Sequence, residues 1–333
     1  MEFIEMACDE VKADVRSAIT PAISPAFTPS ISTHMSLHLS SLPPRLDSID
    51  CPLLRQHDVV LNVLRLDLMH PHLHGNKWFK LQPNVEYALA QQMPTILSFG
   101  GAYSNHLYAL AAAGKQFGLR TIGMVRGELV QPLNPVLGFA QQQGMELVAV
   151  SRTEYRRKSE PEFIEQLRQR FGAFHLVPEG GGNELGVTGC TQIVRLLEWQ
   201  STERPRYIGL ACGTGTTLAG VVIGLHATRS QPLPTVLGVG VVNAPGYLRQ
   251  EVARRLPLAC APTWSMLEDY HGGGYGKTSP ALQAFLTEFS RYSTIPLEPV
   301  YTGKLLQGLF DQIRQGLIPA GAEVLALHSG GIY

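Results

Sequence analysis

The sequence predicts an α/β protein of two doubly wound lobes, each built on an open parallel sheet. Short β-branched runs alternate with longer amphipathic runs between residues 95 and 150, and the alternation returns between residues 207 and 329. Such alternation is typical of β-α-β units, in which a crossover helix leads the chain to a parallel strand. With 333 residues, the chain can bury a sizeable core without disulfides or metals.

The first set of expected elements has three strands and two helices. The strands are TILSF (95–99), RTIGMV (120–125) and MELVAV (145–150). The helices are HLYALAAAGKQFG (106–118) and PVLGFAQQQG (135–144).

The second set has the same style, which is why we expect a second lobe of the same class. Its strands are YIGLAC (207–212), TVLGVGVV (235–242) and EVLALHS (323–329). Its helices are TLAGVVIGLHA (217–227), APGYLRQEVARRL (244–256) and LLQGLFDQIRQG (305–316).

Residues 1–45 are expected to be a disordered extension. Residues 15–43 are rich in Ser, Thr and Pro, and the repeated prolines prevent a long helix. The first residues, MEFIEMACDEVKAD, are acidic, whereas a signal or transit peptide would be basic.

Composition limits the classes of partner and the compartment. The 27 basic and 27 acidic side chains balance, so nothing favours binding to nucleic acid or to an anionic membrane surface. No apolar run approaches the roughly 20 residues needed to span a bilayer. Cys8, Cys51, Cys190, Cys212 and Cys260 are scattered without CxxC spacing, which argues against a disulfide framework or a zinc site. We expect a cytoplasmic protein.

Ligands of open parallel sheets bind outside the carboxyl ends of the strands, so the loops after those ends are the candidate site. One of them follows YIGLAC and is made of Gly213, Thr214, Gly215, Thr216 and Thr217. A glycine loop at a helix start offers free N–H groups to a phosphate. The Walker and dinucleotide patterns are both missing, which leaves a monophosphate site or a tight turn that needs small residues.

Two further segments are candidates, each with a structural alternative. Lys77 lies among apolar residues in GNKWFKL with Lys80 three positions on, so its pKa should fall and make it a nucleophile, unless it is a surface lysine. Ser104, in SFGGAYSNH, is placed to cap a helix that Asn105 and His106 open. The same helix start is also suited to a substrate carboxylate.

Taken together, several motifs resemble those of the 1-aminocyclopropane-1-carboxylate deaminase and D-cysteine desulfhydrase family of pyridoxal 5′-phosphate enzymes. The resemblance covers residues 60–331 and follows the family order. The motifs are LRLDLMHPHLHGNKWFKL, SFGGAYSNH, VPEGGGNELGVTG, ACGTGTTLAG, GGGYGKTS, EPVYTGKLLQGL and LALHSGG.

The resemblance implies a tryptophan synthase β-like fold of type II. A small lobe (81–178) would be inserted into a large cofactor-binding lobe (46–80 and 179–333), and the cofactor would lie between them. It also implies a homodimer that acts on a small amino acid.

The resemblance assigns roles to individual residues. Lys77 would form the Schiff base with the cofactor, Asn105 would bond its 3′-oxygen, and the loop 213–217 would hold its phosphate, with support from Lys80. Ser104 would lie beside the substrate carboxylate. Tyr275 and Tyr301 would line the substrate pocket.

One position departs from the deaminases proper, which resemble DPVYEG and place a glutamate opposite the pyridine nitrogen. Here EPVYTG has Thr302, as in the desulfhydrases, and a threonine can only bond a neutral ring. His106 in SNH also resembles the desulfhydrase branch. Tyr103 stands where both branches usually have Gln, so the pocket is expected to differ from both.

The sequence therefore favours a β-elimination that converts D-cysteine to pyruvate, sulfide and ammonia. The alternatives are 1-aminocyclopropane-1-carboxylate deaminase, which would give 2-oxobutyrate and ammonia, and a non-catalytic pyridoxal-phosphate-binding protein. A serine or threonine dehydratase shares the fold but usually has Ser-x-Lys around its lysine.

Overall fold

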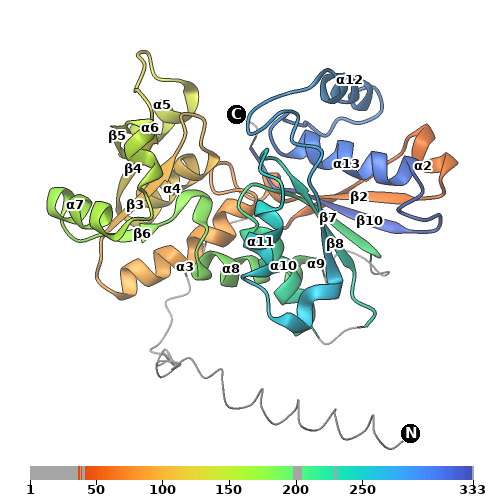
Figure 1. Ribbon diagram of the computed structural model, residues 1–333, viewed down its shortest axis with the longest axis horizontal. Helices are drawn as coiled ribbons and strands as arrows, with labels where there is room; N and C mark the ends of the chain where they lie inside the picture. The colour runs from red at the N-terminus through yellow and green to blue at the C-terminus, as the bar shows by residue number, and fades with distance from the viewer. Residues whose placement is uncertain (1–36, 38, 40–41, 198–204, 229–230, 332–333) are drawn as a thin grey trace, which may run out of the picture. The chain divides into compact units, whose positions relative to one another are not determined.

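Two separate sheets organise the chain in this computed structural model, which describes residues 37, 39, 42–197, 205–228 and 231–331 (Figure 1). Within these residues the smaller sheet has four strands, all parallel. In spatial order they are β5 (Glu146–Val150), β4 (Arg120–Arg126), β3 (Thr95–Gly100) and β6 (His175–Val177).

The larger sheet has six described strands and is parallel except at one edge. In spatial order they are β1 (Arg45–Ile49), β2 (Val60–Arg65), β10 (Glu323–His328), β7 (Tyr207–Cys212), β8 (Thr235–Gly240) and β9 (Trp264–Leu267). The predicted α/β class with two doubly wound lobes is confirmed. One edge departs from the parallel arrangement, because β1 pairs antiparallel with β2.

Helices cover both faces of the larger sheet. One face packs against α8 (Glu184–Thr191), α9 (Ile193–Leu197), α10 (Thr216–Ala227) and α11 (Tyr247–Ala253). The other packs against α2 (Pro52–Gln56), α12 (Pro280–Phe289) and α13 (Thr302–Arg314). Strand β10 shows the two-residue period: Val324 and Ala326 face α13, and Leu325 and Leu327 face the opposite core.

The smaller sheet is also covered on both faces. Helices α3 (Asn76–Ala90), α4 (Asn105–Phe117) and α5 (Pro135–Gln142) pack on one side, and α6 (Arg152–Arg156) and α7 (Pro161–Phe171) on the other. Short 3-10 turns complete the chain: η1 (Leu66–Leu68), η2 (Glu179–Gly181) and η3 (Leu258–Thr263).

Helix α3 runs across the predicted boundary between residues 80 and 81. Its Phe79 belongs to a core of the larger sheet, whereas Leu81 and Val85 belong to a core of the smaller one. The described strands of the smaller sheet lie within 81–178, and α3 packs on the cores of both sheets.

The predicted extension 1–45 lies largely outside the described residues. Of its described part, Leu42 donates its backbone N–H to the Met69 carbonyl at 2.8 Å, and Arg45 already begins β1. Leu42 and Arg45 thus make backbone contacts with the larger lobe, and the rest of the extension stays a prediction.

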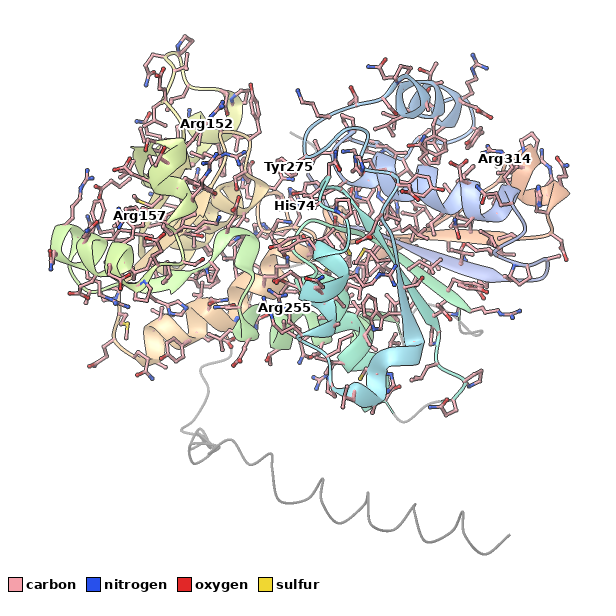
Figure 2. The ribbon with its side chains drawn as sticks, in the orientation of Figure 1. His74, Arg152, Arg157, Arg255, Tyr275 and Arg314 are labelled. Atoms are coloured by element: carbon pink, nitrogen blue, oxygen red, sulfur yellow. The ribbon has the colours of Figure 1, made fainter. Side chains whose placement is uncertain are left out.

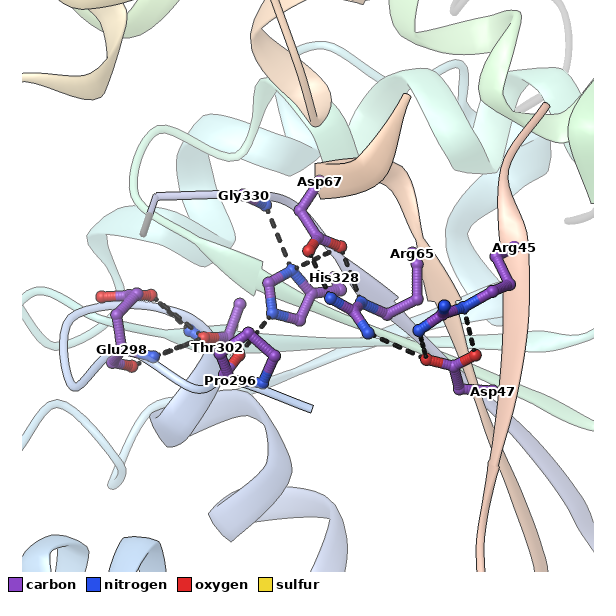
Figure 3. Close-up of polar contacts among 9 residues, drawn as sticks. All are labelled: Arg45, Asp47, Arg65, Asp67, Pro296, Glu298, Thr302, His328 and Gly330. Carbon is purple, nitrogen blue, oxygen red and sulfur yellow. Dashed lines mark hydrogen bonds and ion pairs between the residues drawn. The ribbon is translucent and has the colours of Figure 1, made fainter. Parts of the chain in front are cut away.

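A buried chain of charges links the edge strand β1 to the carboxyl end of β10 (Figure 3). Arg65, only 3% exposed, donates to Asp47 of β1 and makes two hydrogen bonds to Asp67. Asp67 lies 3.1 Å from Nδ1 of His328, whose Nε2 lies 2.8 Å from the Pro296 carbonyl. Burial alone would raise the pKa of Asp67, but the hydrogen bonds and charges of His328 and Arg65 outweigh it and hold that pKa well below its usual range. These linked interactions join the end of β10, at His328, to the segment before α13, at Pro296.

In the part of the chain that the structure describes, no helix has the length and apolar character needed to cross a bilayer.

Candidate active site

A cavity opens at the carboxyl ends of the strands, with about 460 Å³ of space that is partly open to solvent. Tyr275 is exposed on the side of the larger lobe that faces the smaller one (Figure 2). The cavity is lined by residues from both lobes: Asn76, Lys77, Lys80, Asn105, His106, Gly180, Ala211, Cys212, Gly213, Thr214, Gly215, Thr217, Leu218 and Tyr301. Seven of the site residues predicted from sequence are in this lining.

The amine of Lys77 lies in the first turn of α3 and faces the cavity. Its Nζ donates to Oδ1 of Asn76 at 2.7 Å, and Asn76 Nδ2 donates to Oγ1 of Thr217 at 2.9 Å. Burial and the neighbouring charge of Lys80 lower the pKa of Lys77 from 10.5 to about 7. A substantial fraction of this amine is therefore neutral, and nucleophilic, at neutral pH.

Lys80 is the second amine of the same helix turn and is almost fully buried. Burial lowers its pKa. Among the described residues, its Nζ has one hydrogen-bond acceptor, the Gly180 carbonyl at 3.1 Å. Because an ammonium group has three donors, it retains capacity for an anion in the cavity.

The glycine loop lies between β7 and α10, as the sequence predicts. Gly215 caps α10 with φ of +74°, and a Cβ there would lie 2.6 Å from Cγ2 of Val252. The hydroxyls of Thr214 and Thr216 lie 3.0 Å apart. Gly213, Thr214, Gly215 and Thr217 line the cavity, whereas Thr216 is fully buried beneath it. The loop presents the first N–H groups of a helix to the cavity.

The segment Ser104–His106 begins α4, and its predicted cap is confirmed. Ser104 Oγ accepts a hydrogen bond from the Leu107 N–H at 3.2 Å, and Ser104 is not part of the cavity lining. Asn105 and His106 do line it. Nε2 of His106 lies 2.9 Å from the hydroxyl of Ser98, and burial and the lysine charges lower the pKa of His106 to about 3. His106 is therefore neutral and is a buried histidine of the α4 start.

Two tyrosines meet at the mouth of the cavity. The Tyr301 hydroxyl donates to the Tyr275 hydroxyl at 3.2 Å, and the Tyr301 ring centroid lies 5.7 Å from Nζ of Lys77. Burial and the neighbouring Tyr275 raise the pKa of Tyr301 well above its ordinary value, so it keeps its proton. The structure thus brings the two predicted pocket tyrosines together, but only Tyr301 lines the cavity beside Lys77.

Thr302 is buried and is not part of the cavity lining. Its Oγ1 lies 3.2 Å from Oε1 of Glu298 and accepts the Glu298 N–H at 3.1 Å. Glu298 also accepts the backbone N–H groups of Val300, Tyr301 and Thr302. Burial raises the pKa of Glu298, and these hydrogen bonds oppose that rise. The threonine hydroxyl is therefore paired with the carboxylate of Glu298, to which the sequence motif had assigned no role.

Sequence reasoning missed two functional candidates, Asn76 and Glu298. Asn76 lies directly before Lys77, but its contact to Thr217 crosses 141 positions of the chain. Glu298 is the first residue of EPVYTG, and its position as an N-terminal carboxylate of α13 is the signal that was available.

The arrangement fits pyridoxal 5′-phosphate. An amine with a pKa near 7 can condense with an aldehyde, and the buried Lys80 with the start of α10 can hold a phosphate. Gly213 keeps the loop free of a side chain where a Cβ would lie 3.3 Å from the Tyr301 ring.

Comparison with known proteins points to the same cofactor. Residues 49–330 match the model of the pyridoxal-phosphate dependent enzyme family. The chain is 31% identical to a putative 1-aminocyclopropane-1-carboxylate deaminase of Thermotoga maritima, over 81% of this chain and 88% of that protein. It is 28% identical to the putative deaminase of Pyrococcus horikoshii, over 81% and 84%. It is 29% identical to the 1-aminocyclopropane-1-carboxylate deaminase of Burkholderia vietnamiensis, over 78% and 82%.

Solved structures agree at the level of the fold. The crystal structure of an ACC deaminase homologue superposes with a TM-score of 0.76 at 25% identity, covering 89% of this chain and 91% of that one. A fungal L-serine ammonia-lyase from Rhizomucor miehei superposes with a TM-score of 0.63 at 16% identity, covering 88% and 95%. The chain therefore belongs to the fold-type-II pyridoxal-phosphate-dependent enzymes, in the family of the 1-aminocyclopropane-1-carboxylate deaminases and D-cysteine desulfhydrases.

Proposed function

We propose that this enzyme catalyses β-elimination on a small amino acid, with D-cysteine as its substrate. The reaction takes up one water and yields pyruvate, sulfide and ammonia. The observation that carries the choice of substrate is Thr302, which replaces the glutamate of the deaminases with a hydroxyl paired to Glu298. Without a carboxylate directly opposite the ring nitrogen, opening a cyclopropane should be harder.

Lys77 is the proposed base. The bound cofactor would supply an electron sink that stabilises negative charge at Cα. An amine with a pKa of about 7 can both attach the cofactor and, once the substrate has displaced it, remove the Cα proton. Asn76 would keep the Lys77 amine on the side of the cavity beside Thr217.

The substrate would be oriented by the other predicted residues. The start of α4, with Ser104 and Asn105, is suited to the α-carboxylate because its N–H groups carry partial positive charge. Tyr275 and Tyr301 would lie beside the departing thiol. The Tyr301 hydroxyl donates to that of Tyr275, which would keep its own proton to donate to the thiol because burial raises its pKa. Lys80 and the loop Gly213, Thr214, Gly215, Thr216 and Thr217 would hold the cofactor phosphate, Asn105 its 3′-oxygen, and Thr302 would lie at its ring nitrogen.

The first experiment tests the site itself. The purified protein loaded with pyridoxal phosphate is reduced with borohydride and digested, and the labelled peptide is identified by mass spectrometry. We expect the label on Lys77; a label on Lys80 or another lysine would refute the assignment.

The second experiment tests the reaction. D-cysteine, L-cysteine, D-serine and 1-aminocyclopropane-1-carboxylate are offered separately, and sulfide and 2-oxo acid are measured. We expect sulfide and pyruvate in equal amounts from D-cysteine. A loaded protein that turns over none of the four would support the binding-protein alternative.

A second candidate is 1-aminocyclopropane-1-carboxylate deaminase, because that activity is the one named for the relatives. The pairing of Thr302 with Glu298 is compatible with it: the hydroxyl donates to the carboxylate and accepts the Glu298 N–H, and its second lone pair could accept from a protonated ring nitrogen. Formation of 2-oxobutyrate from the cyclopropane, without sulfide from D-cysteine, would establish this candidate.

We also propose that the enzyme is a homodimer and works in the cytoplasm. Light scattering coupled to size exclusion measures the mass of the particle, and about twice the 36.4 kDa of the chain is expected.

A further inference from the structure

The loop that carries Tyr275 has little conformational preference of its own. Gly272, Gly273, Gly274 and Gly276 flank the tyrosine, and all four have positive φ. Tyr275 itself is 46% exposed. Glycine loses more conformational entropy on ordering than other residues. Two backbone hydrogen bonds shape the segment, from the Gly274 N–H to the His271 carbonyl and from the Lys277 N–H to the Gly274 carbonyl, but both are internal, so a contact from outside is needed to fix its position.

Lys304 provides such a contact. It lies in the first turn of α13, three positions after Tyr301, and its side chain is completely buried. Its Nζ donates to the His271 carbonyl at 2.7 Å and to the Gly274 carbonyl at 3.1 Å, so both acceptors belong to the Tyr275 loop. A Cβ on Gly272 would lie 3.7 Å from Cε of Lys304, which shows how closely the loop wraps the amine.

The burial of this amine is costly. Among the described residues it forms no ion pair, although the charge of Glu298 acts on it from the start of the same helix. Burial lowers the pKa of Lys304, and Glu298 opposes that change. A buried cation held by two carbonyls of one loop stabilises the fold less than an apolar side chain of the same size often would. The two hydrogen bonds from the Lys304 amine instead fix the position of that loop.

We infer that Lys304 is a positioning residue that holds the glycine loop so that the Tyr275 hydroxyl meets that of Tyr301. Both tyrosines are then set by the first turn of α13, Tyr301 directly and Tyr275 through the lysine. The inference rests on the proposed role of the tyrosine pair in the substrate pocket. Lys304 itself touches neither substrate nor cofactor.

The test compares Lys304→Met with Lys277→Met. Lys277 is an exposed lysine next to the same loop, so its replacement is a matched control. Hydrogen exchange followed by mass spectrometry measures the peptide that spans residues 268–278. We expect exchange in Lys304→Met to be at least about tenfold faster than in the wild type, and exchange in Lys277→Met to be unchanged.

Turnover provides the second readout. In Lys304→Met, kcat/KM should fall by at least about tenfold while the fraction of Lys77 that borohydride fixes to the cofactor stays the same. In a protein that already carries Tyr275→Ala, adding Lys304→Met should lower kcat/KM by less than about a further twofold, because the lysine acts through the tyrosine.

Unchanged exchange of the loop, or an equal kinetic loss with and without Tyr275, would overturn the inference. If Lys304→Met does not fold, Lys304→Gln keeps a donor of shorter reach and is measured in the same two ways. If the wild type turns over no amino acid, the proposed function fails, but the exchange experiment still decides whether Lys304 holds the loop.

Discussion

Two glycine-rich loops, one that lines the cavity and one that carries Tyr275, are held in different ways. The loop 213–217 is bounded by β7 and α10, so regular structure fixes both of its ends. The loop 271–276 has no strand or helix directly on either side, and its His271 and Gly274 carbonyls accept hydrogen bonds from Lys304 of α13. The first loop is therefore readable from local sequence, whereas the second depends on a residue about 30 positions away. Composition alone does not say which glycine loop is rigid.

Removing the Lys77 amine, which faces the cavity, has the largest expected effect. Lys77→Ala should lower kcat/KM by at least about a thousandfold, because attachment of the cofactor and removal of the proton are lost together. Absorbance of the bound cofactor above 400 nm and turnover are measured on the same sample. Lys115→Ala, at the surface end of α4, is the control and should match the wild type.

A methyl group added to each glycine loop tests whether the two loops differ in how tightly they are packed. Gly215 and Gly276 have nearly the same φ, +74° and +69°, but only Gly215 has a neighbour, Val252, within 4 Å of an added Cβ. Gly215→Ala should cost about 2–4 kcal/mol of unfolding free energy, from strain plus overlap, and should weaken cofactor binding. Gly276→Ala should cost only about 1 kcal/mol, from strain alone.

Urea denaturation and titration with pyridoxal phosphate measure the two quantities. Equal losses for the two variants would mean that the loops do not differ in the way described.

The reactivity of the Lys77 amine should depend on pH, which is a smaller effect. The neutral form of Lys77 reacts, so its labelling by an acylating reagent in the cofactor-free protein should rise about tenfold per pH unit up to about pH 7 and then level off. An ordinary lysine, with a pKa of 10.5, would continue to rise.

Two variants move this inflection in opposite directions. Asn76→Asp places a carboxylate beside the amine and should move it above pH 7, whereas Glu298→Gln removes a distant negative charge and should move it slightly below. Mass spectrometry of the Lys77 peptide follows both. An inflection that does not respond to Asn76→Asp would show that the Lys77 amine is not held at that side chain.

The elements beside the motifs could be predicted from sequence because their periodicity and caps are local. Strands β3 and β7, the start of α4 at Ser104 and the loop before α10 fall where the patterns indicate. The edge strand β1 was missed because RLDSI breaks the apolar–polar alternation at Asp47 and Ser48 and follows a Pro-rich segment, and its pairing with β2 is a tertiary contact. Sequence order likewise cannot show that Thr302 turns its hydroxyl to Glu298.

The link between β1 and Arg65 also bears on how the chain avoids self-association. Strand β1 occupies the side of β2 that would otherwise present unpaired backbone N–H and carbonyl groups, and Asp47 neutralises the guanidinium of Arg65 there. A shortened chain that began after Ile49 would leave β2, with its apolar Leu61 and Val63, as an open template for strands of other molecules. The short polar strand thus covers one edge of the sheet whose central strand β7 leads into the candidate site.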